Sequence, residues 1–487
     1  MSRNLKNPDK AVSKGAGWPR FVARAAPFDT PWNRSGLLRM LLLIPDNVYY
    51  PVSQLGNSKR SLLLNMSQIK QLSALEILDS RGLPTLQVTC HLASGAQGTV
   101  SIPGGALSKS GNAAELRDGD PKRYRGYGCR QAVEKIEGEL NKVLQKRVVQ
   151  QQSELDQVMI MLDGTPNKAR LGANTLLAVS LAFARAQARE QNIPLYHYFA
   201  ALLDQAPTRL PRPLITLFNG GSYSEGRVPI QDLQIVPLTA QTMDQALTIA
   251  FDIYYAASDI IVERYGSRAL KSEEGGLVPP FPTAEAMLDT AVAAIEAAHL
   301  RPGEDVALTI DVAASQFYQD EAYAFAEQTL SGPEMVELLS SWLARYPLVG
   351  LEDGLADEDW EQWQALTHQH GENVLILGDD LIHTNPMRVH RAIESQAING
   401  VLLKLDQIGT LSEAIETYKL AWSAGWCVVL GARSGETEDD WLADLAVGWA
   451  GNYLKAGGFT QSERLAKYNR LLAIEATTQL PMARWKD

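Results

Sequence analysis

Four short apolar segments in the second half of the chain each end on a residue that can bind a metal or move a proton. They are residues 306–311 (VALTID), 347–352 (PLVGLE), 373–379 (NVLILGD) and 400–404 (GVLLK). Segments this short and this rich in Val, Leu and Ile predict buried parallel strands. Their ends lie 41, 27 and 25 residues apart, which leaves room for a helix between successive strands. The alternation predicts an α/β barrel.

The end residues of these segments make a metal-dependent enzyme the natural expectation. Carboxyl ends of neighbouring barrel strands meet at one mouth, where the active sites of this architecture lie. Asp311, Glu352 and Asp379 offer the hard oxygen ligands that Mg²⁺ prefers. A single strand-end acid could equally cap the following helix, but three of them at successive strand ends favour metal binding.

Composition narrows the class of protein further. The chain has 487 residues, of which 45% are apolar and 21% charged, and its formal net charge is −11. This charge disfavours nucleic-acid binding, which requires clustered Lys and Arg. No apolar run approaches the roughly 20 residues that a membrane-spanning helix needs. The cysteines Cys90, Cys129 and Cys427 lack metal-ligand spacing and fit buried thiols in a reducing compartment, so we expect a cytoplasmic protein.

The chain divides into three predicted parts. Residues 1–65 contain six prolines and no sustained helical or strand period, which predicts an N-terminal extension that is disordered or precedes the true start; a targeting segment is the alternative. Residues 66–207 show the pattern of a sheet followed by helices, an α+β capping domain. A proline-marked passage then leads to the apolar run 214–218, which we take as the first strand of a barrel domain, 208–487.

Nine motifs, in order along the chain, resemble the enolase (phosphopyruvate hydratase) family. They lie at residues 74–88 (ALEILDSRGLPTLQV), 115–120, 171–174, 218–222, 311–315, 378–381, 402–414, 433–439 and 462–469. So many ordered matches are far more specific than a lone motif. The resemblance implies an α+β capping domain before an eight-stranded barrel, a homodimer, dependence on Mg²⁺, and a phosphorylated carboxylic acid such as 2-phosphoglycerate as substrate.

The resemblance also implies roles for individual residues. Lys404 corresponds to the base that removes a proton next to the substrate carboxylate, and nearby positive charge is expected to lower its pKa. Glu274 corresponds to the general acid, although a Glu-Glu-Gly-Gly segment is by itself typical of a solvated turn. The remaining substrate-binding positions are Arg433 and Ser434 for the phosphate, and Lys455, Gln231 and Asp232 around the carboxylate.

Several loop positions depart from the family pattern. Tyr223 and Ala432 replace histidines, Asp232 replaces a glutamate, and Leu107 replaces the serine that ligates a second Mg²⁺. Three carboxylates and one Mg²⁺ leave a net charge of −1, and a phosphorylated carboxylate adds roughly −3. Without the second cation this charge is only partly offset. The sequence therefore predicts low hydratase activity or a different substrate.

Three functions remain open at this point. The first is a working phosphopyruvate hydratase, favoured by the retained base, acid and metal ligands. The second is a divergent lyase that acts on a related phosphorylated or phosphono acid, favoured by the four departures. The third is a non-catalytic homologue with a binding role, which the retained Lys404 and Glu274 argue against, because a pure scaffold has no need of an acid and a base.

Overall fold

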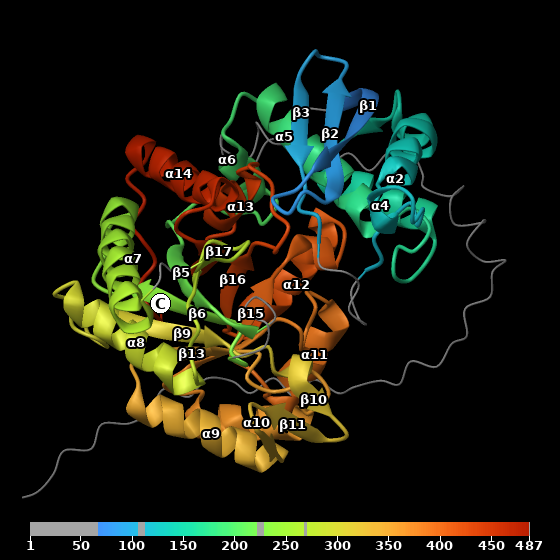
Figure 1. Ribbon diagram of the computed structural model, residues 1–487. Helices are drawn as coiled ribbons and strands as arrows, with labels where there is room; N and C mark the ends of the chain where they lie inside the picture. The colour runs from blue at the N-terminus through green and yellow to red at the C-terminus, as the bar shows by residue number, and fades with distance from the viewer. Residues whose placement is uncertain (1–66, 106–112, 222–227, 267–269, 487) are drawn as a thin grey trace, which may run out of the picture. The chain divides into compact units, whose positions relative to one another are not determined.

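The computed structural model describes residues 67–105, 113–221, 228–266 and 270–486, and Figure 1 shows the course of the chain through them. By their contacts these residues belong to one unit, Asn65–Asp487. The predicted N-terminal extension lies outside the described residues, as do the loop positions Leu107 and Tyr223.

The N-terminal part of this unit, which we call the capping lobe (residues 67–202), is built on a four-stranded antiparallel sheet. The strands are β1 (Ser67–Leu78), β2 (Pro84–Leu92), β3 (Gln97–Ser101) and β4 (Val148–Val149), in the order β3-β2-β1-β4. Every second residue of β2 from Leu86 to Leu92 is fully buried, as the two-residue period of a strand requires. This apolar row forms one side of the core of the lobe.

Helices cover the sheet of the capping lobe. The longest is α5 (Ala173–Glu190), which packs against β2 and β3 and is buried along most of its length. Residues 130–144 form α2 (Arg130–Lys135), a π-helical turn (Ile136–Leu140) and α3 (Asn141–Leu144). The other helices of the lobe are α4 (Gln152–Asp163) and α6 (Leu195–Ala201).

Eight strands form a closed barrel in the C-terminal part. They are β5 (Arg212–Asn219), β6 (Asp232–Pro237), β9 (Val306–Asp311), β13 (Leu348–Glu352), β14 (Leu375–Gly378), β15 (Gly400–Leu403), β16 (Cys427–Gly431) and β17 (Tyr453–Gly458). Neighbouring strands pair in this order, and β17 pairs with β5 to close the ring. The four strands predicted from the apolar segments are β9, β13, β14 and β15, and they run parallel.

One strand of the barrel runs against the others. β6 pairs antiparallel with both β5 and β9, with Asp232 opposite Asp311. The parallel rhythm of the sequence did not predict this reversal. It follows from the direct connection between β5 and β6, because consecutive antiparallel strands need no crossover helix. Asp232 consequently lies at the first residue of its strand, yet at the same end of the barrel as Asp311.

The interior of the barrel is closed by a cluster of apolar side chains, which we call the apolar layer. Seven buried residues from six strands form this layer: Leu214, Val236, Leu375, Leu377, Leu402, Val429 and Tyr453. Helices surround the strands (Figure 1): α7 (Met243–Tyr265), α8 (Ala284–Ala297), α9 (Gly332–Arg345), α10 (Trp360–His370), α11 (Pro386–Ser395), α12 (Leu411–Ser423), α13 (Trp441–Gly448) and α14 (Ser462–Thr477). Two small β elements are inserted, β7–β8 (Leu270–Lys271, Leu277–Val278) and β10–β12 (Tyr318–Gln319, Ala322–Phe325, Gln328–Leu330).

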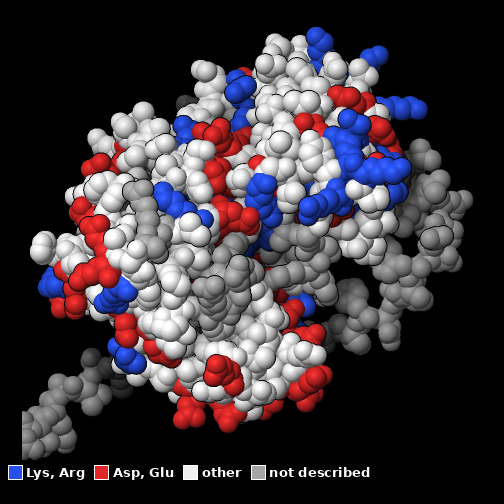
Figure 2. Space-filling model, in the orientation of Figure 1, with Lys and Arg blue, Asp and Glu red and all other residues white. Residues whose placement is uncertain are grey.

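The surface carries charges of both signs. On the face in Figure 2, acidic and basic side chains are interspersed, and basic side chains gather near α2 of the capping lobe. The net charge of −11 therefore does not produce a uniformly acidic surface on this face. Among the described residues, no helix is both long and apolar enough to cross a membrane.

Candidate active site

The strand ends place ionisable side chains directly above the apolar layer of the barrel. Alternate residues of a strand point to the same side, so Asp379 continues the inward row of Leu375 and Leu377 just beyond the end of β14. By the same rule Lys404 follows Leu402, and Lys455 follows Tyr453. Along each of these strands, the inward-pointing residues thus change from apolar in the core to ionisable at the mouth of the barrel.

A cavity of about 240 Å³ opens at this mouth. Nine of the ten predicted site residues line it: Gln231, Asp232, Glu274, Asp311, Asp379, Lys404, Arg433, Ser434 and Lys455. The tenth, Glu352, does not line the cavity but contacts Lys455 with both oxygens at 2.8 Å. Ala432 lines the cavity as well, at a position where the sequence had predicted the loss of a histidine.

Lys455 holds three of the acids together. Its ammonium group lies 2.8 Å from a carboxylate oxygen of Asp311, 2.8 Å from Glu352 and 3.5 Å from Asp232. Burial, together with the Asp311 charge, raises the pKa of Glu352 well above its usual range. Burial next to Glu274 raises the pKa of Asp232 to about 8. The cluster thus favours added positive charge.

The carboxylates of the site fit a hard divalent cation. Asp311 is almost fully buried, and its Oδ1 has no hydrogen-bond partner within the described part of the chain. A buried carboxylate oxygen without a partner is costly, and a cation would remove that cost. Asp311 and Glu352 already share the Lys455 ammonium, and Asp379 lies at the adjacent strand end. These residues suit Mg²⁺, which favours carboxylate oxygens and water.

Two further acids lie next to the predicted ligands. Among the described residues, Asp353, Asp379 and Asp380 can bring one oxygen each within 4.8 Å of one another. Asp353 accepts hydrogen bonds from the backbone N–H of Asp379 at 3.0 Å and of Asp380 at 2.8 Å. It adopts a left-handed conformation with φ of 42°, which is costly for a residue other than glycine. Asp353 therefore fixes the backbone that carries Asp379. The only sign of this role in the sequence is that acids are adjacent in pairs there, Glu352 with Asp353 and Asp379 with Asp380.

Lys404 forms an ion pair with Asp379, whose other oxygen accepts a hydrogen bond from Gln407 at 3.1 Å. Burial alone would lower the pKa of Lys404, but the acids around it, Asp379 first among them, together raise the pKa. The lowering expected from the sequence stays a prediction for the metal-loaded protein, because it depends on the charge of the metal ion as well as on Lys455.

Glu274 and Ser434 meet on another side of the cavity. Ser434 Oγ donates a hydrogen bond to Glu274 Oε1 at 3.0 Å, and the backbone N–H of Glu274 donates to Ser272 at 3.0 Å. The turn that carries Glu274 passes very close to β17. A Cβ on Gly458 would lie 2.3 Å from the backbone carbon of Gly275, so glycine is required for this approach.

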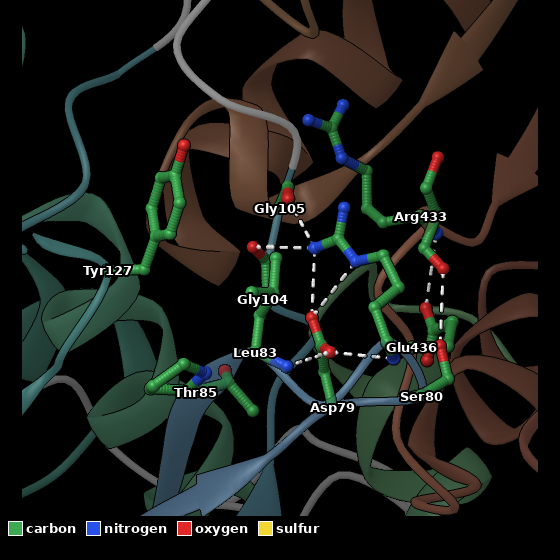
Figure 3. Close-up of polar contacts among 12 residues, drawn as sticks. Asp79, Ser80, Leu83, Thr85, Gly104, Gly105, Tyr127, Arg433 and Glu436 are labelled. Atoms are coloured by element: carbon green, nitrogen blue, oxygen red, sulfur yellow. Dashed lines mark hydrogen bonds and ion pairs between the residues drawn. The ribbon is translucent and has the colours of Figure 1, made fainter. Parts of the chain in front are cut away.

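The capping lobe supports the segment that carries Arg433 and Ser434. Arg81 pairs with Asp79 at 2.9 Å and donates to the carbonyl of Gly105 at 2.8 Å. The N–H of Ser80 donates to the carbonyl of Glu436 at 2.8 Å. Figure 3 shows these contacts, with the side chain of Arg433 pointing away from them. The lobe therefore fixes the backbone of this segment, while the guanidinium of Arg433 lines the cavity.

A closed eight-stranded α/β barrel with acids and lysines at its mouth defines a class of barrel enzymes that act at their strand ends. Comparison with protein families identifies which one. The family model described as enolase, C-terminal TIM barrel domain, matches residues 207–481, and the one described as enolase, N-terminal domain, matches residues 69–199. The chain belongs to the enolase family, and the two matches support an enolase-like lyase.

Proposed function

We propose that the protein is a Mg²⁺-dependent hydro-lyase that dehydrates 2-phosphoglycerate to phosphoenolpyruvate, with low turnover. The observation that carries this proposal is that Lys404 and Glu274, a potential base and a potential acid, line one cavity together with Asp311 and Asp379. Elimination of water needs both groups: one to take a proton from carbon and one to give a proton to the departing hydroxide.

Each residue has a defined task in this proposal. Lys404 takes the proton from the carbon next to the carboxylate, and Glu274 protonates the leaving hydroxide as the carbon–carbon double bond forms. Arg433 and Ser434 orient the phosphate. Lys455 holds the substrate carboxylate, with Gln231 and Asp232 beside it. These assignments are supported by the shared cavity and by the planar guanidinium, which suits bidentate contact with an oxyanion.

Asp311, Glu352 and Asp379 would hold the Mg²⁺. When bound, this ion supplies the positive charge that stabilises the enediolate form of the substrate carboxylate. Lys404 must be neutral to act as a base, and Asp379 is the acid that raises its pKa most. Because a carboxylate engaged with a cation exerts less field on its neighbours, Lys404 is a stronger candidate for the base in the metal-loaded protein.

Substitution of Lys404 tests the proposal. We expect Lys404→Met to lower kcat for 2-phosphoglycerate by about a thousandfold, because it removes the base but keeps the length of the side chain. Product formation is followed by the ultraviolet absorbance of phosphoenolpyruvate. Lys419→Met, which alters an exposed lysine on α12, serves as the control with the same change in charge. Equal activity of the two variants would exclude Lys404 as the base.

A second candidate function is supported by the pairing of the basic residues. Lys404, Lys455 and Arg433 each contact an acid of the protein itself, which favours a lyase for a related acid over an efficient 2-phosphoglycerate enzyme. Solvent deuterium exchange at the carbon next to the carboxylate separates the functions. Exchange without dehydration supports the related lyase, whereas an absence of exchange with any candidate acid supports a binding role.

A further inference from the structure

Asp406 contacts Arg433, a residue of the site, from outside the cavity. It belongs to the short 3₁₀ turn Leu405–Gln407, which directly follows the strand end that carries Lys404. The residue does not line the cavity, but its Oδ2 lies 2.8 Å from Nε of Arg433, which does. None of the roles described above uses this acid.

The geometry of the pair divides the guanidinium of Arg433 into two sides. The Nε side faces Asp406, so the Nη side is the one available to a ligand in the cavity. Both residues are nearly buried, each with 9% of its surface exposed. Charges in such a setting are weakly screened by solvent and salt. The carboxylate therefore acts on Arg433 and on any anion bound to it.

Asp406 weakens the attraction of Arg433 for anions. Burial lowers the pKa of Arg433, but the surrounding acids, Asp406 first and then Asp379, Glu115 and Asp380, raise it. An anion in contact with the Nη side lies only a few ångströms beyond the guanidinium, within range of the repulsion from Asp406. This repulsion is proportional to the charge of the ligand. A doubly charged phosphoryl group is thus penalised about twice as strongly as a carboxylate.

We propose that Asp406 is a specificity-determining residue that selects against a doubly charged phosphoryl group at Arg433 and shifts the site toward acids that present a singly charged group there. The inference rests on the proposed role of Arg433 in binding the anionic group of the substrate. It makes a hydroxy acid with two carboxylates a better match to the charge at this position than a phosphate ester.

The test removes the charge and keeps the contact. Asp406→Asn has the same shape and retains an oxygen that can accept from Nε of Arg433. Binding is measured by isothermal titration calorimetry in the presence of Mg²⁺, with 2-phosphoglycerate and malate as ligands. We expect the variant to lower the Kd for 2-phosphoglycerate by about three- to tenfold and the Kd for malate by a smaller factor. Asp320→Asn, an exposed change of equal charge, should alter neither.

A second substitution guards against an effect of the amide itself. Asp406→Ser also removes the charge and offers a hydroxyl oxygen, so it should strengthen 2-phosphoglycerate binding as well. Adding Arg433→Gln to Asp406→Asn should abolish the gain. Three outcomes overturn the proposal. The first is unchanged or weaker binding of 2-phosphoglycerate in both Asp406 variants, and the second is an equal gain in affinity for malate. The third is that neither the wild type nor any variant binds 2-phosphoglycerate.

The outcome can be separated from that of the proposed function. Calorimetry detects the binding of a ligand even where no product forms. If the protein releases no phosphoenolpyruvate but Asp406→Asn binds 2-phosphoglycerate more tightly than the wild type, the proposed function is contradicted and the inference is supported. Normal turnover with no effect of Asp406→Asn on binding does the reverse.

Discussion

At the scale of single residues, Asp156 shows how the fold treats an acid that takes no part in the active site. It lies on α4, is fully buried and accepts hydrogen bonds from the backbone N–H of Ser412 at 3.0 Å, from its hydroxyl at 2.6 Å and from Gln152 at 3.1 Å. Burial nevertheless raises its pKa to about 6, and these donors only partly offset the effect. The folded protein therefore retains this proton at a pH where the unfolded chain has lost it.

This difference predicts a dependence of stability on pH. Between about pH 4, near the ordinary pKa of aspartate, and about pH 6, the folded state binds more protons than the unfolded state, so the free energy of unfolding falls as the pH rises. In Asp156→Asn this contribution is absent. Urea unfolding at several pH values should show the stability of the wild type declining relative to the variant by about 3 kcal/mol over this interval, then running parallel to it. Parallel curves throughout would show that Asp156 does not titrate there.

The metal ligands and the base that the sequence predicted, Asp311, Glu352, Asp379 and Lys404, share one property: they lie at or just beyond the end of an apolar strand. Asp379 and Lys404 could be placed at the mouth because a strand alternates its sides. Asp353 and Asp406 could not, because the first follows a strand with a left-handed backbone and the second lies in a 3₁₀ turn. Neither conformation has a repeating pattern in the sequence, so their contacts emerge only in three dimensions.

At the scale of secondary-structure elements, one glycine sets how closely a strand and a helix approach in the capping lobe. Gly98 lies on β3, opposite α5. A Cβ at this position would lie 2.3 Å from the carbonyl oxygen of Ala182 and 2.3 Å from the backbone nitrogen of Ala186. Because backbone atoms cannot move aside as a side chain can, any larger residue would separate the two elements.

We predict that Gly98→Ala destabilises the protein by about 3 kcal/mol, since the added methyl group must push α5 away from the sheet. Thermal unfolding followed by circular dichroism measures the effect. Gly138→Ala is the matched control, because a Cβ on this exposed residue of the π-helical turn would meet no atom of the described residues within 4 Å; helix propensity should make it neutral or stabilising by up to about 1 kcal/mol. A similar melting temperature for the two variants would contradict the close-approach argument.

Some elements were predictable and others were not, for physical reasons. The strands β9, β13, β14 and β15 were evident because buried parallel strands are apolar throughout. The direction of β6 was not, because strand direction depends on how the chain returns and not on its own residues. The π-helical turn Ile136–Leu140 was not predicted either, because one extra residue in a single turn barely alters the helical spacing of the buried positions.

At the scale of the whole unit, the capping lobe and the barrel are joined by a partly buried ion-pair cluster. Arg185 on α5 donates to Asp439 at 2.6 and 3.0 Å and to the carbonyl of Thr99 at 2.6 Å. Asp439, from the loop before α13, also accepts from the backbone N–H of Ser101 at 2.8 Å. These residues are far apart in the sequence, so no local pattern could have paired them. The same loop begins with Arg433 and Ser434, which links the cluster to the site.

Removing Arg185 should therefore loosen the lobe from the barrel. Arg185→Leu leaves the partly buried Asp439 without its cationic partner, and losing charge-assisted hydrogen bonds of this kind costs about 2 kcal/mol. We expect a lower melting temperature, with faster hydrogen exchange at Ser101 and in the 433–440 loop than in the barrel strands. Arg189→Leu is the control: it lies on the same helix, is exposed, and donates to the carbonyl of Gln97 within the lobe. If both variants melt alike and the exchange of the loop is unchanged, the Arg185 cluster does not hold the two parts together. The position of the Arg433 segment then depends on other contacts, such as the backbone hydrogen bonds from Ser80 to Glu436 and from Gly104 to Gly435.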